Sequence, residues 1–302
     1  MVEIGGYFGL ESHGEGFPHD DGICFNSCCS ALRYLIRTEG IVRLHVPRYT
    51  CGSVHVAVEK ENCEIVPYDL GADWFPAKTL PQDEFILFNN YFGVSGQRVR
   101  IMAERHRRLI VDAAQAFFSK PCGYATLYSP RKFVGVPDGG ILCGIHLQHR
   151  QLDQGTSWHK AMHLLKRTDV CGSFGYADFL ANEEKTADEP ILGMSRLTYT
   201  MMGNIDYKFV AERRFANFSY LREHLPTTFP VSLSSDDVPM VYPYMTDDPR
   251  LRMRLISAKI YIPTYWPGVR NCTSLPERIL PLPIDQRYAD EDMKRIVEAV
   301  RS

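Results

Sequence analysis

Residues Leu109 to Gly144 read LIVDAAQAFFSKPCGYATLYSPRKFVGVPDGGILCG, and this stretch decides the fold. It begins with the apolar run Leu109–Val111, which ends abruptly at Asp112. A short run of Leu, Ile and Val between polar residues is typical of a strand buried in a parallel sheet. A carboxylate just beyond the C-terminal end of such a strand lies where open α/β sheets bind ligands. The stretch therefore predicts an α/β fold with a ligand site beside Asp112.

Lys132 lies further along the same stretch, just before a turn rich in Gly and Pro. A desolvated lysine amine loses its proton readily and can then form a Schiff base with an aldehyde. For each residue taken alone, a surface Asp112 or a solvated Lys132 is the simpler interpretation. The functional interpretation is favoured because other parts of the chain fit the same site.

Three motifs in this stretch, DAAQ at 112–115, SPRK at 129–132 and GG at 139–140, resemble the DegT-like (StrS-type) sugar aminotransferases. The likeness extends from EIGGYF at 3–8 to LPIDQRY at 282–288. The enzymes of this family have fold type I and depend on pyridoxal 5′-phosphate (PLP). The resemblance therefore implies an α/β fold with a mostly parallel sheet in a large PLP-binding domain.

The resemblance also implies a domain boundary and roles for single residues. The large domain would span residues 1–195, and a connecting helix with a small C-terminal α+β domain would span residues 196–302. Lys132 would form the Schiff base with PLP, and its freed amine would move a proton between carbon atoms. In the same family pattern, three residues would bind the pyridine nitrogen, the phenolic oxygen and the phosphate, in that order: Asp112, Gln115 and Ser129.

A second part of the cofactor site is predicted where a helix begins after Asn26. The N-terminus of a helix offers free N–H groups and a partial positive charge, which suit a phosphate. The resemblance puts the phosphate turn here, with Ser27, Cys28 and Cys29 at the positions that hold it. The alternative interpretation is a plain N-cap without a ligand.

Further strands are predicted at 42–47, 64–69, 85–88 and 141–143, the last as an antiparallel edge strand. The family stacks an aromatic residue on the cofactor ring, and the matching position here is Cys51. Either Tyr49 stacks in its place, or the thiol of Cys51 packs on the ring face.

Asn90 and Tyr91 follow the predicted strand 85–88, at the edge where the strands end. A side chain at this edge can reach the cofactor or the substrate, and we expect these two residues to do so. An isolated Asn is more often a turn residue. Asp138, which precedes the two glycines, is expected to be solvated.

The C-terminal half predicts mainly helices. The periodicity indicates a helix at 158–167, one long helix at 195–225 and a closing helix at 290–300. Residues 168–193 are polar and contain Gly, which predicts a loop. His159 and His163 share a helical face, but no third ligand stands nearby, so no metal is expected.

The composition is that of an ordinary globular protein, with 302 residues, 45% of them hydrophobic, and a formal net charge of −2. The Lys and Arg residues do not cluster as a nucleic-acid surface requires. No apolar run approaches the ~18 residues of a membrane span, and no signal peptide is expected. The nine cysteines lack paired spacing, which favours reduced thiols in the cytoplasm.

The leading hypothesis from the resemblance is a PLP-dependent aminotransferase. Its amino donor would be an amino acid, glutamate first, and its acceptor a keto-sugar nucleotide. Such enzymes work as homodimers, here through the N-terminal arm and the loops near 145–195. Two alternatives stay open: a PLP-dependent eliminase or dehydratase, and a binding protein that keeps the fold without turnover. Lys132 argues against the dehydratase, because His replaces this Lys in the related dehydratases.

Overall fold

The computed structural model describes residues 7–11, 14, 16–144, 146–147, 150–186, 188–266 and 278–302. Its centre is a seven-stranded sheet in the order β1-β7-β6-β5-β4-β2-β3. β7 is antiparallel to both of its neighbours, β1 and β6, and the other pairs are parallel. The strands are β1 (Ile23–Phe25), β2 (Arg43–Pro47), β3 (Glu64–Tyr68), β4 (Phe85–Asn89), β5 (Leu109–Ala113), β6 (Ala125–Tyr128) and β7 (Gly140–Cys143).

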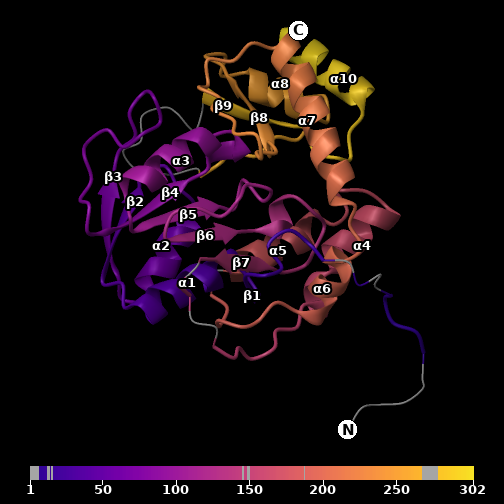
Figure 1. Cartoon of the computed structure of the whole chain (residues 1–302). Helices are drawn as coiled ribbons and strands as arrows, with labels where there is room; N and C mark the ends of the chain where they lie inside the picture. The colour runs from indigo at the N-terminus through magenta and orange to yellow at the C-terminus, as the bar shows by residue number, and fades with distance from the viewer. Residues whose placement is uncertain are drawn as a thin grey trace.

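Helices cover both faces of the sheet (Figure 1). α1 (Cys28–Glu39) and α2 (Gly52–Glu59) pack on one face, and α3 (Gly96–Arg105) packs on the other. Side chains alternate along β5, so Ile110 joins the core under α1 and Val111 joins the core under α3. By the same alternation, Asp112 faces the α1 side.

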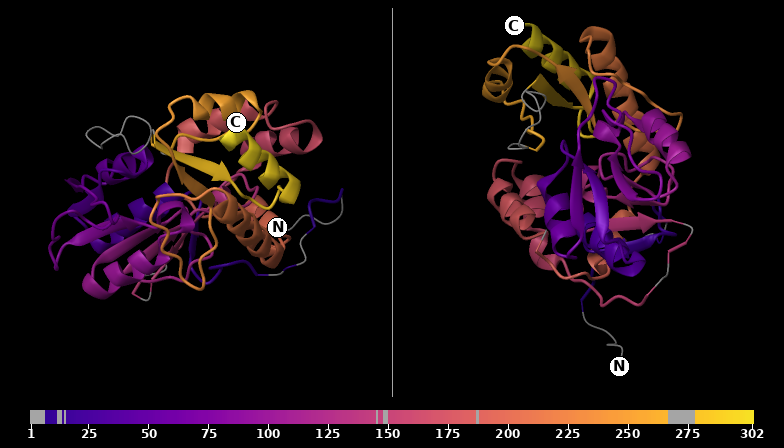
Figure 2. Two further views of the ribbon diagram at one scale, coloured as in Figure 1. Left: turned by 90° about the horizontal axis from the view of Figure 1, so that it is seen from above. Right: turned by 90° about the vertical axis from the view of Figure 1, so that its left-hand side faces the viewer.

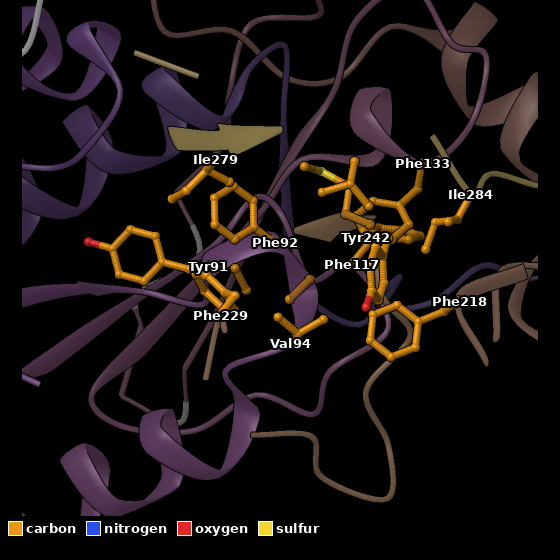
Figure 3. Packing of buried hydrophobic residues seen from close by; sticks show 14 of the residues in the cluster. Tyr91, Phe92, Val94, Phe117, Phe133, Phe218, Phe229, Tyr242, Ile279 and Ile284 are labelled. Carbon is orange, nitrogen blue, oxygen red and sulfur yellow. The ribbon is translucent and has the colours of Figure 1, made fainter. Parts of the chain in front are cut away.

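The C-terminal part forms a second group around a two-stranded antiparallel sheet, β8 paired with β9. The right-hand view of Figure 2 shows this group (orange to yellow) beyond one edge of the large sheet. Aromatic and aliphatic side chains of both groups pack into one core (Figure 3). The elements of the group are α7 (Tyr207–His224), β8 (Val241–Met245), α8 (Leu251–Ser257), β9 (Ile279–Pro283) and α10 (Asp290–Arg301).

Most of the predicted elements are confirmed, to within a few residues at their ends. The predictions at 42–47, 64–69, 85–88 and 109–111 correspond to β2, β3, β4 and β5. The strand predicted at 141–143 is antiparallel, but it is not the edge, because β1 pairs with its outer side. Neither β1 nor β6 was expected. The boundary between the domains at 195 and 196 stays a prediction.

Two predictions in the region 158–225 are wrong. The loop expected at 168–193 contains α5 (Tyr176–Thr186), which follows α4 (Met162–Asp169). The long helix expected at 195–225 is two helices, α6 (Arg196–Met202) and α7. α7 starts anew because Asp206 caps it, accepting a hydrogen bond of 2.9 Å from the Phe209 N–H. No helix of the described ranges is long and apolar enough to span a membrane.

Candidate active site

Asp112 and Lys132 lie together at the C-terminal edge of the sheet. Asp112 is buried near the end of β5, and its Oδ1 accepts a hydrogen bond of 2.9 Å from the Ala114 N–H. Lys132 is exposed at the end of the 3₁₀ turn η2 (Pro130–Lys132). Burial raises the pKa of Asp112, and the nearby charge of Lys132 opposes that rise. The structure thus brings the predicted carboxylate and the predicted amine within electrostatic reach of each other.

We call residues 130–136, which include Lys132, the lysine turn. The two glycines that follow it, Gly139 and Gly140, let the backbone approach the start of α1 closely. A Cβ atom at Gly140 would lie 2.2 Å from Ser27 C and 2.3 Å from Cys28 N. Gly139 has a φ of 125°, a conformation that L side chains rarely adopt, and its N–H donates to Asn26 O at 3.0 Å. The turn after Lys132 and the N-terminus of α1 therefore form one unit.

Asp138 anchors this unit, and its expected exposure to solvent is wrong. The carboxylate is 2% exposed, and it accepts hydrogen bonds from the Ser195 N–H (3.1 Å), the Ser195 hydroxyl (2.9 Å) and the Thr198 hydroxyl. A buried carboxylate is tolerated only when donors satisfy it in this way. Asp138 therefore ties the Gly139–Gly140 turn to the first turn of α6.

The N-terminus of α1 lies beside Asp112 and Lys132. Ser27 is the N-cap, and its Oγ accepts a hydrogen bond of 3.0 Å from the Ser30 N–H. The thiols of Cys28 and Cys29 are half-buried, and burial is the main reason why the pKa of each is raised. Both thiols also interact electrostatically with the Asp112 carboxylate and the Lys132 amine. The helix predicted after Asn26 thus begins at Cys28, and the phosphate turn stays a prediction.

The two candidates for the ring face, Tyr49 and Cys51, have different surroundings. Tyr49 is buried among the rings of Trp74, Tyr91 and Trp266, with centroid distances of 5.7, 5.8 and 4.8 Å. Cys51 is half-buried and interacts electrostatically with both Cys28 and Cys29. The thiol therefore lies on the side of the site, whereas the Tyr49 ring packs in the core.

The side-chain amide of Gln115 has one group that is hydrogen-bonded within the protein and one that is unpaired. Its Oε1 accepts a hydrogen bond of 2.8 Å from the Phe92 N–H. Its Nε2 is buried and has no hydrogen-bond partner among the described residues. An unpaired buried donor costs roughly 1–3 kcal/mol, so such atoms are rare unless a ligand or water completes them. The free Nε2 is therefore the strongest sign of a missing acceptor in this site.

The remaining predicted site residues are Ser129, Asn90 and Tyr91. Ser129 lies at the start of η2, and its side chain makes no capping hydrogen bond. Asn90 Oδ1 accepts from the Ser95 N–H at 3.0 Å, and the Tyr91 hydroxyl donates to Tyr49 O at 2.8 Å. Asn90 and Tyr91 are fully buried, so the geometry gives no support to their predicted contact with the substrate.

In the described ranges, no three His, Cys, Asp or Glu side chains lie close enough together to hold a metal ion. Sequence reasoning missed the role of Asp138, described above. It also missed the contact of Arg214 with the backbone just after Lys132, where Arg214 Nη2 donates to Phe133 O at 3.1 Å. A carboxylate directly before two glycines is a signal that could have indicated the role of Asp138. Nothing in the sequence around Arg214 points to the lysine turn.

Solved structures share this architecture over most of the chain. A DegT DnrJ EryC1 StrS aminotransferase from Brucella abortus is 18% identical, with a TM-score of 0.60, over 92% of this chain and 84% of that one. DesV from S. venezuelae, solved with a ketimine intermediate, is 20% identical, with a TM-score of 0.61, over 93% and 84%. DesI, solved in the presence of its TDP-sugar product, is 14% identical, with a TM-score of 0.57, over 93% and 79%.

The chain has the fold of the DegT-like sugar aminotransferases. The expected fold type I architecture, with its mostly parallel sheet, is thereby confirmed. No family model and no curated protein matches the sequence. At these low identities the likeness establishes the fold, and the reaction follows from the site residues as a proposal.

Proposed function

We propose that this protein is a PLP-dependent aminotransferase. The observation that carries the proposal is the presence of three groups at the C-terminal edge of the sheet. These are the exposed amine of Lys132, the buried carboxylate of Asp112 beside it, and the unpaired Nε2 of Gln115. A buried donor without an acceptor at this edge of the sheet is a position where a ligand can complete a hydrogen bond.

The residues present fit PLP. The Nε2 of Gln115 is a free donor for the phenolic oxygen. The N-terminus of α1, with Cys28 and Cys29 in its first turn, suits the phosphate. The Asp112 carboxylate suits the ring nitrogen, and the Cys51 thiol suits the ring face. The Ser129 hydroxyl is a further donor for the phosphate.

PLP, when bound, supplies an electron sink. The amine of Lys132 would hold the cofactor, and the same amine would carry the proton that transamination moves between two carbon atoms. Burial disfavours the charged form of Asp112, and a positive group beside it favours that form. The Asp112 carboxylate would therefore hold the ring nitrogen of the cofactor and keep that nitrogen protonated.

The amino donor in this proposal is an amino acid, with glutamate as the first candidate. The acceptor is a keto group on a nucleotide-linked sugar. The fold shared with DesI, which was solved with a TDP-sugar product, supports this acceptor class. The eight cysteines in the described ranges are free, which supports a reducing compartment such as the cytoplasm.

The working form in this proposal is a homodimer. Large apolar side chains are exposed along the α4–α5 hairpin and the turn before it, and exposed apolar patches mark interaction surfaces. They include Trp158, Leu165, Val170, Phe174 and Tyr176, each more than half exposed. Sedimentation of the wild type against Trp158→Asp tests this surface: the wild type is expected to be a dimer and the variant to dissociate more readily.

The reaction is tested with the purified protein and PLP. A visible absorbance band is expected on reconstitution, and glutamate is expected to convert it while 2-oxoglutarate forms. Conversion by glutamate followed by amination of a keto-sugar nucleotide would support the whole proposal. A band that no amino donor converts would favour an eliminase or a non-catalytic binding protein. Absence of any band would remove the PLP assignment.

A further inference from the structure

Arg214 of α7 is a buried cation that holds three separate segments together. Its side chain is only 2% exposed. Nε donates to Gln286 Oε1 at 3.0 Å, Nη1 to Met240 O at 3.0 Å, and Nη2 to Phe133 O at 3.1 Å. The guanidinium also lies 4.6 Å from the centroid of the Phe133 ring. One side chain therefore binds the end of the lysine turn, the entry to β8 and the loop after β9.

All three acceptors of Arg214 are uncharged. No carboxylate of the described residues lies within salt-bridge distance, although Asp285 is near enough to influence the guanidinium. Burial lowers the pKa of Arg214 to about 10, which still leaves it charged near neutral pH. Burying a charge among neutral groups is costly, and a hydrophobic residue would fill the space at lower cost. The guanidinium is therefore explained by the three carbonyl groups that it fixes.

The carbonyl of Phe133 connects Arg214 to the lysine turn. Phe133 directly follows Lys132, and its carbonyl accepts from Arg214 Nη2 and also from Gln286 Nε2, at 2.8 Å. Among the described residues, the other hydrogen bonds of the backbone from 130 to 136 are local, such as the bond from the Phe133 N–H to Pro130 O at 2.9 Å. Figure 3 shows the Phe133 side chain beside Ile284, close to the C-terminal group.

The same guanidinium is connected to Gln115 through the backbone. Arg214 Nη1 binds Met240 O, and the Met240 N–H donates to Phe92 O at 2.9 Å. The Phe92 N–H in turn donates to Gln115 Oε1 at 2.8 Å. This bond fixes the side-chain amide whose Nε2 is unpaired. Arg214 thus lies one hydrogen bond from the residue after Lys132 and three from the amide of Gln115.

We propose that Arg214, together with Gln286, is a positioning residue that sets where the amine of Lys132 lies relative to the side-chain amide of Gln115. This inference rests on the proposed function, since those two groups are assigned to PLP. A shift of about 1 Å between groups that must act together can cost about a hundredfold in rate. Positioning of this kind comes from the α7 side of the molecule and involves no contact of Arg214 with the cofactor.

The test compares Arg214→Met with Arg213→Met. Arg213 is a matched neighbour that, among the described residues, forms an ion pair only with Asp290, at the surface and at 3.1 Å. Hydrogen exchange in the protein without cofactor is expected to quicken about tenfold or more at Phe133 and Val134 in Arg214→Met. With PLP and glutamate, kcat is expected to fall about 10- to 100-fold while KM stays within about threefold. Arg213→Met is expected to match the wild type in both measurements.

Gln286→Leu serves if Arg214→Met does not fold. It removes one donor from Phe133 O and the acceptor of Arg214 Nε, but it keeps the bonds from Arg214 to Phe133 O and Met240 O. Smaller changes in the same direction are expected. Unchanged exchange at Phe133, or faster exchange with unchanged kcat, would overturn the positioning role. A wild-type protein that forms no bond with PLP would refute the proposed function instead. In that event, faster hydrogen exchange at Phe133 in Arg214→Met would still show that Arg214 holds the lysine turn, and unchanged exchange would refute it.

Discussion

Replacing Gly140 by Ala probes the contact on which the candidate site is built. The added Cβ would lie 2.2 Å from Ser27 C, 2.3 Å from Cys28 N and 2.4 Å from Ser27 O. Carbon atoms in contact prefer about 3.5–4.0 Å, so the two segments must separate by about 1 Å or more. These obstacles are backbone atoms, and no change of rotamer can relieve them.

The size of the effect follows from that separation. Overpacking of a tight site costs about 1–3 kcal/mol, and loss of the 3.0 Å hydrogen bond from Gly139 N–H to Asn26 O adds about 1 kcal/mol. We expect Gly140→Ala to lower the free energy of unfolding by about 3 kcal/mol. PLP affinity should fall about ten- to hundredfold, because the displaced Cys28 N–H loses about 1.5–3 kcal/mol of charge-assisted bonding.

Urea unfolding measures the first quantity, and an absorbance titration with PLP measures the second. Gly135→Ala is the matched control, since a Cβ there meets only Leu164 Cδ2, at an ordinary 3.6 Å. The control is expected to stay within about 0.5 kcal/mol of the wild type and to bind PLP normally. Equal stability and equal PLP affinity in the two variants would refute the close approach of Gly140 to α1.

Three further substitutions test single groups. Asp112→Asn should abolish most of the activity, by about a hundredfold or more. Burial raises the pKa of Asp112, so its ionisation lowers the stability of the wild type as pH rises. The Asn variant without cofactor should therefore be more stable than the wild type at about pH 7, and the two should not differ below about pH 3.5. Urea unfolding at both pH values measures this difference. Asp138→Asn should destabilise by about 2–4 kcal/mol in the same assay, because an NH₂ group would face the donors of Ser195; no loss would contradict the buried network. Gln115→Glu keeps the acceptor for the Phe92 N–H and removes the free donor, so PLP affinity should fall about tenfold or more by titration, and unchanged affinity would remove Gln115 from the site.

Local patterns in the sequence were enough for β5 and for its neighbour β4. Leu109–Val111 is a compact apolar run that ends at a carboxylate, and β4 begins with the similar run Phe85–Phe88. β6, the neighbour of β5 on its other side, was missed. β1 was missed because Ile23–Phe25 is only three residues long and is a strand only through its pairing with Gly140–Leu142, far away in the chain. Such a non-local partner leaves no periodicity to read.

The candidate site shows the same limit. The pairing of Asp112 with Lys132 follows from the topology of a parallel sheet together with the family motif. The burial of Asp138 does not, because its donors Ser195 and Thr198 come from a helix about 60 residues away. The contacts of Arg214 could not be predicted either, because a guanidinium on an amphipathic helix normally predicts a solvated face. The break between α6 and α7 did leave a signal, the capping residue Asp206, which the apolar stripe outweighed.

The most direct test of the central claim locates the covalent bond. The protein is saturated with PLP, reduced with borohydride, digested and mapped by mass spectrometry, alongside Lys132→Ala. Lys132 is exposed, so this variant should fold normally. We predict a single pyridoxyl group on Lys132 in the wild type and none in the variant. A pyridoxyl group on another lysine, or one that persists in Lys132→Ala, would contradict the account.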